Sequence, residues 1–138
     1  MKTHCSLGSN ILGGSKKELV LMAQAIAFNH HEKWDGSGYP SGKSGKRIPL
    51  TARVVAITDV FDALLSKRVY KPAYTIDQCI DIMIEGKNKH FDGELLEIFL
   101  SQVDDFIAFR EKIEKLLEDT SVIDIFNSYF SEFDEFLN

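Results

Sequence analysis

The sequence contains few cysteines and no long hydrophobic run. Its only two cysteines, Cys5 and Cys79, lie too far apart for a CxxC metal site and are too few for a disulfide framework, so we expect reduced thiols. No run of about 18 apolar residues occurs, which argues against a membrane span. The first ten residues, MKTHCSLGSN, lack the apolar segment of a secretory signal. We therefore predict a cytoplasmic protein with no membrane-spanning segment.

Basic residues are not in excess either. The chain has 16 Lys and Arg against 21 Asp and Glu, which gives a net charge of −5. The negative charge is concentrated in residues 104–138, which contain 3 basic and 10 acidic residues, whereas residues 1–103 contain 13 and 11. The acidic tail would repel nucleic acid, and the first part could accept an anionic substrate. We predict that the chain has no nucleic-acid partner.

The apolar residues follow helical periodicity almost throughout, and no alternating stretch predicts a strand. The pattern therefore predicts an all-α fold. The expected helices cover residues 16–31, 49–66, 75–89 and 92–103, with one or two amphipathic helices after residue 105. We expect residues 104–138 to pack on a domain formed by residues 1–103. The alternative is that this acidic segment docks on a partner.

Three local signals mark the starts of helices. Ser15 with Glu18 and Thr75 with Gln78 have the spacing of capping boxes, and Asp92 can cap the helix that follows it. Residues 19–28 are apolar on nearly every side of their helix, so we expect this helix to be buried all round.

Candidate metal ligands lie around the segment HHEKWDGSGYP, residues 30–40. Neutral imidazoles and carboxylates bind first-row divalent metals, and a cluster of them can activate water. The candidates are His4, His30, His31, Asp59 and Asp62. For the histidine pair alone, the alternative is two surface residues that interact favourably with the C-terminal end of a helix.

Asp59 strengthens the metal prediction because it lies within the apolar segment VVAITDVFDALL. A buried carboxylate needs a cation, a metal or several hydrogen bonds. Asp62 follows one turn later, so both carboxylates can face the same way. The alternative for Asp59 is a structural carboxylate that caps a neighbouring loop.

Arg68 and Lys71 follow this helix in the segment SKRVYKPAY. A guanidinium and an ammonium group near a metal cluster suit a phosphate ester. The alternative is a pair of solvated surface charges.

Three segments together resemble the HD-GYP family, a branch of the HD-domain metal-dependent phosphohydrolases: HHEKWDGSGYP, ARVVAITDVFDALLSKRVYK and GKNKHFDGELLEIF. The opening MKTH followed by GSNIL is similar to a further family segment. The resemblance implies a helical HD-domain-like bundle, of which residues 1–103 would be the C-terminal portion. It also implies hydrolysis of the bacterial second messenger cyclic di-GMP at a centre of two or three metal ions, with iron or manganese expected.

The resemblance further implies roles for individual residues around a metal-activated water. The implied metal ligands are His4, His30, His31 and Asp59, and the implied phosphate-contacting residues are Arg68 and Lys71. The implied signature loop beside the site comprises Gly36, Gly38, Tyr39 and Pro40. Asp62 would orient a ligand or Arg68.

The main departure of the sequence from the family is that no His-Asp dipeptide occurs in its 138 residues. That pair bridges the two principal metals in family members. We therefore expect a bundle that is incomplete at the N-terminus, no complete catalytic set, and impaired or absent activity in this chain alone. The alternatives are a non-catalytic signalling module that binds cyclic di-GMP or a protein partner, and a hydrolase of another phosphate ester. Helix 19–28 would lack part of its cover, so we also expect a homo-oligomer.

Overall fold

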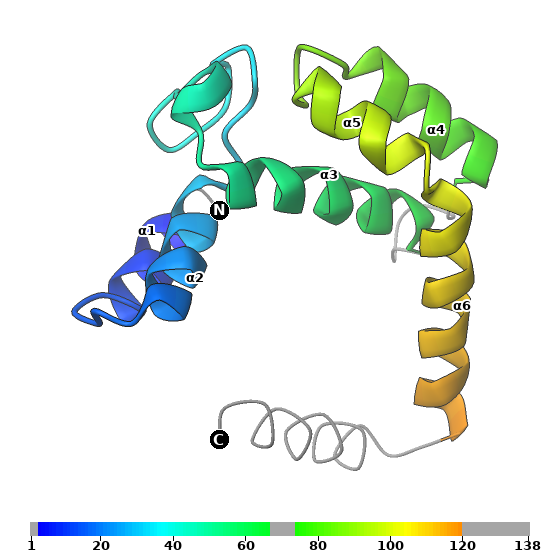
Figure 1. Cartoon of the computed structure of the whole chain (residues 1–138), viewed down its shortest axis with the longest axis horizontal. Coiled ribbons are helices and arrows are strands. Elements are labelled where there is room, and N and C mark those ends of the chain that lie inside the picture. Colours follow the sequence, from blue (N-terminus) through cyan, green and yellow to red (C-terminus); the bar gives the residue numbers. More distant parts are fainter. Residues whose placement is uncertain (1–2, 67–73, 120–138) are drawn as a thin grey trace. The chain divides into compact units, whose positions relative to one another are not determined.

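The structure, a computed structural model, describes residues 3–66 and 74–119 (Figure 1). These residues form six α-helices and one short 3-10 helix, and no strand occurs among them. The elements are α1 (Thr3–Ile11), α2 (Glu18–Asn29), η1 (Gly45–Arg47), α3 (Leu50–Leu65), α4 (Ile76–Glu85), α5 (Gly93–Leu100) and α6 (Val103–Asp119). The prediction of an all-α fold is confirmed. Arg68 and Lys71 lie outside the described residues.

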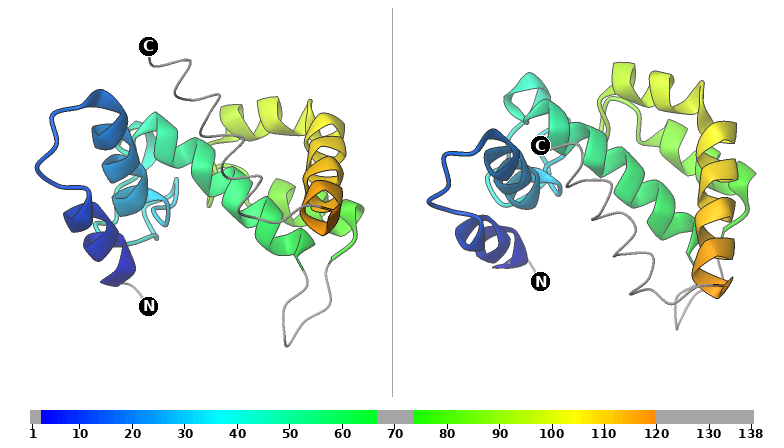
Figure 2. Two further views of the ribbon diagram at one scale, coloured as in Figure 1. Left: turned by 90° about the horizontal axis from the view of Figure 1, so that it is seen from below. Right: turned by 60° about the horizontal axis from the view of Figure 1, so that its bottom comes forward.

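The described residues fall into two units, one ending at Ser101 and the other beginning at Gln102. Within the first unit, α1 packs against α2, α2 against α3, and α3 against both α4 and α5 (Figure 2). The second unit contains α6, which has Asp104 and Asp105 in its first turn. The packing of residues 104–138 on the first domain stays a prediction.

The core of the first unit is formed by α3 together with α4 and α5. Its buried side chains include Ala52, Ala56, Ile57 and Phe61 of α3, Cys79 and Met83 of α4, and Leu96 and Phe99 of α5. The rings of Phe61 and Phe99 lie with their centroids 5.0 Å apart at an angle of 73°, the edge-to-face arrangement that aromatic pairs favour. This contact joins α5 to the last turns of α3.

α1 is a helix that the sequence pattern does not predict. Its residues, THCSLGSNI, include few apolar side chains and one glycine, so its intrinsic preference for helix is weak. Packing against α2 compensates for this weak intrinsic preference. A Cβ atom at Gly8 would lie 3.4 Å from the Cβ of Ala27, so small residues on both helices allow a close approach. Gln24 of α2 also donates a hydrogen bond from Nε2 to the carbonyl oxygen of Ser9, at 3.0 Å.

The start of α2 differs from the predicted capping box of Ser15 and Glu18. The helix begins at Glu18, its N-cap is Lys17, and no side chain caps it. The hydroxyl of Ser15 accepts a hydrogen bond from the amide of Lys17 at 3.2 Å. The capping-box prediction is wrong because a serine hydroxyl can bond to a nearby amide in a local turn as readily as at a helix start.

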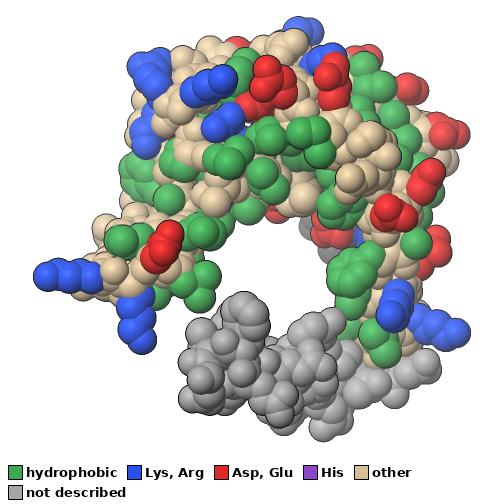
Figure 3. All heavy atoms as spheres, viewed as in Figure 1, with side chains coloured by type: hydrophobic (Ala, Val, Ile, Leu, Met, Phe, Trp, Pro, Cys, Tyr) green, Lys and Arg blue, Asp and Glu red, His purple; other side chains and the backbone are tan. Residues whose placement is uncertain are grey.

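The prediction that α2 is buried all round is also wrong. Leu19, Leu21 and Met22 are 60%, 47% and 41% exposed. Figure 3 shows hydrophobic side chains on the surface over α1 and α2. The apolar pattern of a helix gives its capacity for burial, but the neighbouring elements determine how much of its surface is covered.

Both remaining cap predictions are confirmed. Thr75 and Gln78 form a capping box at the start of α4, with each side chain accepting a hydrogen bond from the backbone amide of the other residue. At the start of α5, the Asp92 carboxylate accepts hydrogen bonds from the amides of Glu94 and Leu95.

Asp92 also joins α5 to α3 through an ion pair. Its Oδ2 lies 2.5 Å from Nη1 of Arg53, and the two side chains are only 3% and 14% exposed. Arg53 additionally donates a hydrogen bond from Nε to the carbonyl oxygen of Ile48, at 3.0 Å. The same carboxylate therefore caps one helix and pairs with a cation on another.

We expect Asp92→Ala to destabilise the first unit by about 3 kcal/mol, because it leaves Arg53 without its carboxylate and α5 without its cap. Asp92→Asn keeps an acceptor for the cap, so it should lose only the part of the stability that is due to the charge of the carboxylate. Urea denaturation measures both values. The control is Glu97→Ala, which breaks an ion pair with Lys87. The side chain of Glu97 is 65% exposed and that of Lys87 is 39% exposed. Glu97→Ala should cost less than about 1 kcal/mol. Equal losses in Asp92→Ala and Glu97→Ala would contradict the structural role of Asp92.

Candidate metal centre

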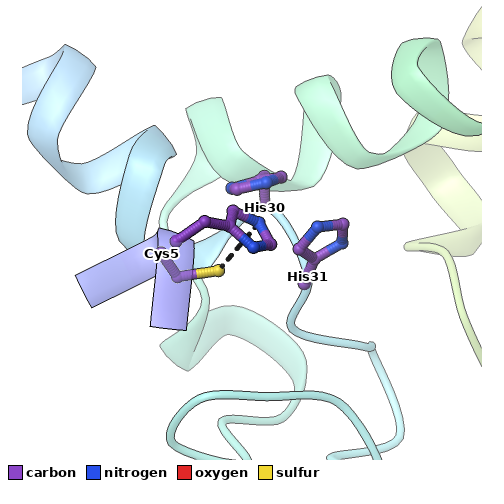
Figure 4. A group of neighbouring side chains, drawn as sticks. Cys5, His30 and His31 are labelled. Carbon is purple, nitrogen blue, oxygen red and sulfur yellow. Dashed lines mark hydrogen bonds between the residues drawn. The ribbon is translucent and has the colours of Figure 1, made fainter. Parts of the chain in front are cut away.

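Three of the four histidines of the chain converge at the contact between α1 and the end of α2. The ring centroid of His4 lies 5.4 Å from that of His30 and 5.0 Å from that of His31, and the rings of His30 and His31 are 4.1 Å apart. Figure 4 shows the rings of His30 and His31 beside the side chain of Cys5. The structure thus brings together the three predicted histidine ligands.

The ligand atoms of the three histidines and of Cys5 all lie within 4.8 Å of one another. Three imidazoles and a thiol suit a first-row divalent metal such as iron or zinc, because imidazole and thiolate both bind such ions well. With small movements of the side chains, one ion could reach every donor. We call these four side chains the donor group.

The backbone of α2 orients the imidazole of His30. Its Nδ1 lies 3.1 Å from the carbonyl oxygens of both Ile26 and Ala27. A carbonyl oxygen can only accept a hydrogen bond, so Nδ1 holds the proton and donates it. The lone pair of the neutral ring is then on Nε2, the arrangement in which metal-binding histidines are commonly held.

The surroundings of His31 favour its neutral form. Burial lowers the pKa of His31, and the nearby rings of His30 and His4 lower it further, whereas the charge of Asp59 raises it. A neutral imidazole is the form that binds a metal. The lowered pKa of His31 therefore favours the form that binding requires.

Cys5 is absent from the ligands predicted from the sequence. It is fully buried, and its Sγ lies 3.4 Å from Nε2 of His4. Burial raises the pKa of the Cys5 thiol, a backbone hydrogen bond at Cys5 lowers it, and the charge of Glu32 raises it. The signal that could have indicated Cys5 is its position next to a predicted ligand. Its place in the group could not be predicted, because the pattern does not predict the helix that carries it.

The two aspartates of α3 differ from the expectation in their exposure to solvent. Asp59 and Asp62 are both exposed, so the predicted burial of Asp59 is wrong. Although the residues around Asp59 are apolar, its own position faces away from the core formed by Ala56, Ile57 and Phe61. Neither aspartate belongs to the donor group. The charge of Asp59 does act on His31, and its role as a ligand stays a prediction.

Glu32, directly after the histidine pair, fixes the loop between α2 and α3. Its side chain is buried with only 1% exposure, and its carboxylate accepts hydrogen bonds from the amides of Ser41 at 2.7 Å and Lys43 at 3.0 Å. The sequence pattern does not indicate this role. These hydrogen bonds hold the loop close to the preceding histidine pair.

The signature loop needs glycine at two positions. Gly36 has a φ of +86°, which a residue with a side chain rarely adopts. At Gly38 a Cβ atom would lie 2.3 Å from the amide nitrogen of Lys33 and 2.5 Å from the carbonyl oxygen of His31. Only a glycine therefore allows the loop to lie against the backbone of the histidine pair.

Tyr39 lies against the donor group. Its amide donates a hydrogen bond to the carbonyl oxygen of His31 at 3.1 Å, and the two rings lie 4.9 Å apart. Pro40 follows through a cis peptide bond. The loop predicted as the signature element thus reaches the donor group through Tyr39.

Comparison with known proteins identifies the family. The sequence profile of the HD domain family matches residues 1–95. The chain belongs to the HD domain family. It is 45% identical over 113 residues to the 3'3'-cGAMP-specific phosphodiesterase 2 of Vibrio cholerae, covering 82% of this chain and 22% of the relative. It is 44% identical over 100 residues to the cyclic di-GMP phosphodiesterase response regulator RpfG of Xanthomonas campestris, covering 72% of this chain and 26% of the relative. The predicted membership of the HD-GYP branch is confirmed.

A solved structure shows the same fold. A crystal structure of a cyclic GMP-AMP-specific phosphodiesterase of Vibrio cholerae matches 75% of this HD domain chain and 23% of its own, with a TM-score of 0.61 and 23% identity. This chain thus spans about a quarter of the length of the relatives that it matches. No helix in the described ranges is both long and apolar enough to cross a membrane.

We expect Glu32→Gln to loosen the loop, because the amide group of glutamine places a donor where the carboxylate accepts two backbone hydrogen bonds. The free energy of unfolding should fall by about 1.5–3 kcal/mol, and the amides of Ser41 and Lys43 should exchange their hydrogens faster. Urea denaturation and hydrogen exchange read by NMR measure the two effects. Glu18→Gln makes the same chemical change at an exposed position of α2 and should cost less than about 1 kcal/mol. Unchanged exchange at Ser41 and Lys43 in Glu32→Gln would show that Glu32 does not hold the loop.

Proposed function

We propose that this chain forms the metal site of a phosphodiesterase that hydrolyses a cyclic dinucleotide, cyclic di-GMP in the first instance. The convergence of three imidazoles on one point carries the proposal. The names of the relatives support it, since they act on cyclic di-GMP or on 3'3'-cGAMP. Because this chain spans only part of those proteins, the reaction is proposed for the protein to which these residues belong.

His4, His30 and His31 would hold the metal, for which we propose iron or manganese. When bound, a divalent metal supplies Lewis acidity and lowers the pKa of water. Asp59 is proposed as a further ligand, supported by the effect of its charge on His31. Asp62, one turn later on α3, is proposed to orient a ligand or Arg68.

Binding of the phosphates is proposed for Arg68 and Lys71, which follow the helix that carries Asp59. Their chemistry supports this, because guanidinium and ammonium groups bind phosphate oxygens well. Figure 3 also shows Lys and Arg side chains gathered over the loop between α2 and α3. In the reaction, the oxygen of water forms a bond to phosphorus, the bond between phosphorus and a ribose oxygen breaks, and that oxygen takes up a proton.

We expect the chain to bind iron or manganese and to lose that metal in His31→Gln. The matched control is His90→Gln, since His90 is the one histidine of the chain that is absent from the donor group. Metal content per chain is measured by plasma mass spectrometry after removal of loose metal. Hydrolysis is measured with cyclic di-GMP, 3'3'-cGAMP and a bis-aryl phosphate in parallel.

Hydrolysis that depends on His31 and not on His90 supports the proposal. Faster turnover of the bis-aryl phosphate than of either cyclic dinucleotide would favour a hydrolase of another phosphate ester. Binding of cyclic di-GMP by metal-loaded protein without turnover would support the non-catalytic signalling module, or a chain that is inactive alone. Equal loss of metal in His31→Gln and His90→Gln would refute the metal site.

We also propose a homo-oligomer, supported by the exposed apolar side chains of α1 and α2. Leu7 and Ile11 of α1 are 59% and 83% exposed, and Leu19 of α2 is 60% exposed. Contact with another copy would remove such side chains from water. We expect sedimentation velocity over a dilution series to show a species larger than one chain, and a monomer at every concentration would contradict this.

A further inference from the structure

Cys5 places a sulfur atom among the imidazoles of the donor group. The residue is 0% exposed, and its Sγ is one of four ligand atoms that all lie within 4.8 Å of one another (Figure 4). His4 and Cys5 come from α1, whereas His30 and His31 follow α2. The sulfur is therefore brought to the histidine pair by the packing of two helices.

The spacing of sulfur and nitrogen suits coordination of one ion. Zinc–sulfur and zinc–nitrogen bonds of about 2.3 and 2.05 Å at a tetrahedral angle put the two donor atoms about 3.6 Å apart. The observed distance between Sγ of Cys5 and Nε2 of His4 is 3.4 Å. Little movement is needed for both atoms to bind the same ion.

We propose that Cys5 is a ligand of the metal held by His4, His30 and His31, so that the centre has three nitrogen donors and one sulfur donor. This inference rests on the metal site of the proposed function and adds a ligand to it. A bond forms between sulfur and the metal, the bond between sulfur and hydrogen breaks, and the proton passes to solvent. No oxidation or reduction is involved.

A sulfur ligand changes which metals the centre prefers. Thiolate binds zinc and iron better than it binds manganese, which prefers oxygen ligands. Of the two metals proposed above, Cys5 thus favours iron. Four protein donors would saturate a tetrahedral zinc ion, whereas iron accepts further ligands.

The competing explanation is that Cys5 is only a small apolar residue of the packed interior, as free cysteines often are. The chain provides its own control for this explanation. Cys79 of α4 is also a free cysteine with 0% exposure, but it is absent from the donor group. A structural effect of losing a buried thiol should occur at both positions, and an effect on the metal only at Cys5.

Cobalt(II) tests the proposal because cobalt bound to a thiolate gives an intense near-ultraviolet charge-transfer band. We expect the full chain and Cys79→Ser to show this band when loaded with cobalt, and Cys5→Ser to lose it. The affinity for zinc, measured by competition with a chelating dye, should fall at least about tenfold in Cys5→Ser and stay unchanged in Cys79→Ser. Absence of the band from cobalt-loaded wild type, or its persistence in Cys5→Ser, would overturn the proposal. Failure of the wild type to bind cobalt would overturn it as well.

X-ray absorption of the zinc-loaded wild type needs no variant, so it decides the question even where Cys5→Ser does not fold. A sulfur neighbour at about 2.3 Å from zinc is expected, and a shell of nitrogen and oxygen alone would overturn the proposal. The result is independent of the hydrolysis assay. A sulfur ligand without hydrolysis would support this inference and count only against catalysis by this chain alone, whereas hydrolysis by a centre without sulfur would refute this inference alone.

Discussion

The packing of α1 against α2 is the contact on which the candidate metal centre depends. Each helix positions two of the four donors, so neither helix alone presents a site. The contact is close because small side chains meet, as Gly8 and Ala27 show, and because Gln24 bonds to the backbone of α1. We expect a side chain larger than that of alanine at Gly8 to push α1 away from α2 and so to change the centre without touching a ligand.

The residues that follow α2 show how a short segment can meet several constraints at once. The ring of His30 is hydrogen-bonded to a carbonyl oxygen of α2. The carbonyl oxygen of His31 accepts a hydrogen bond from the amide of Tyr39. The carboxylate of Glu32 accepts a hydrogen bond from an amide farther along the loop. The orientation of the His30 imidazole therefore depends on hydrogen bonds to the backbone that are made before any metal binds. Donors held in this way lose little conformational freedom on binding, which favours affinity.

Periodicity and cap residues predicted much of the helical fold, because they are local properties. The starts of α4 and α5 follow from Thr75 and Asp92, whose side chains bond to amides two or three residues away. The three histidines are candidate ligands by their residue type, and the resemblance to the HD-GYP family implies the same role. The structure brings them together. α1 was not predicted, since it is a helix by virtue of its contact with α2. The same reason explains Cys5, whose place in the donor group depends on that contact.

The exposure of Asp59 shows the limit of sequence context in the opposite direction. Apolar neighbours along the chain suggested a buried carboxylate, but in a helix the residues beside it in sequence point in other directions, and Ala56 and Ile57 take the buried face. Its charge still reaches His31 and raises the pKa of that imidazole against the effect of burial. A metal at the donor group would bring further positive charge toward Asp59, so binding should strengthen the attraction between α3 and the centre. A role of Asp59 as a ligand therefore stays a proposal, supported by this effect of its charge on His31.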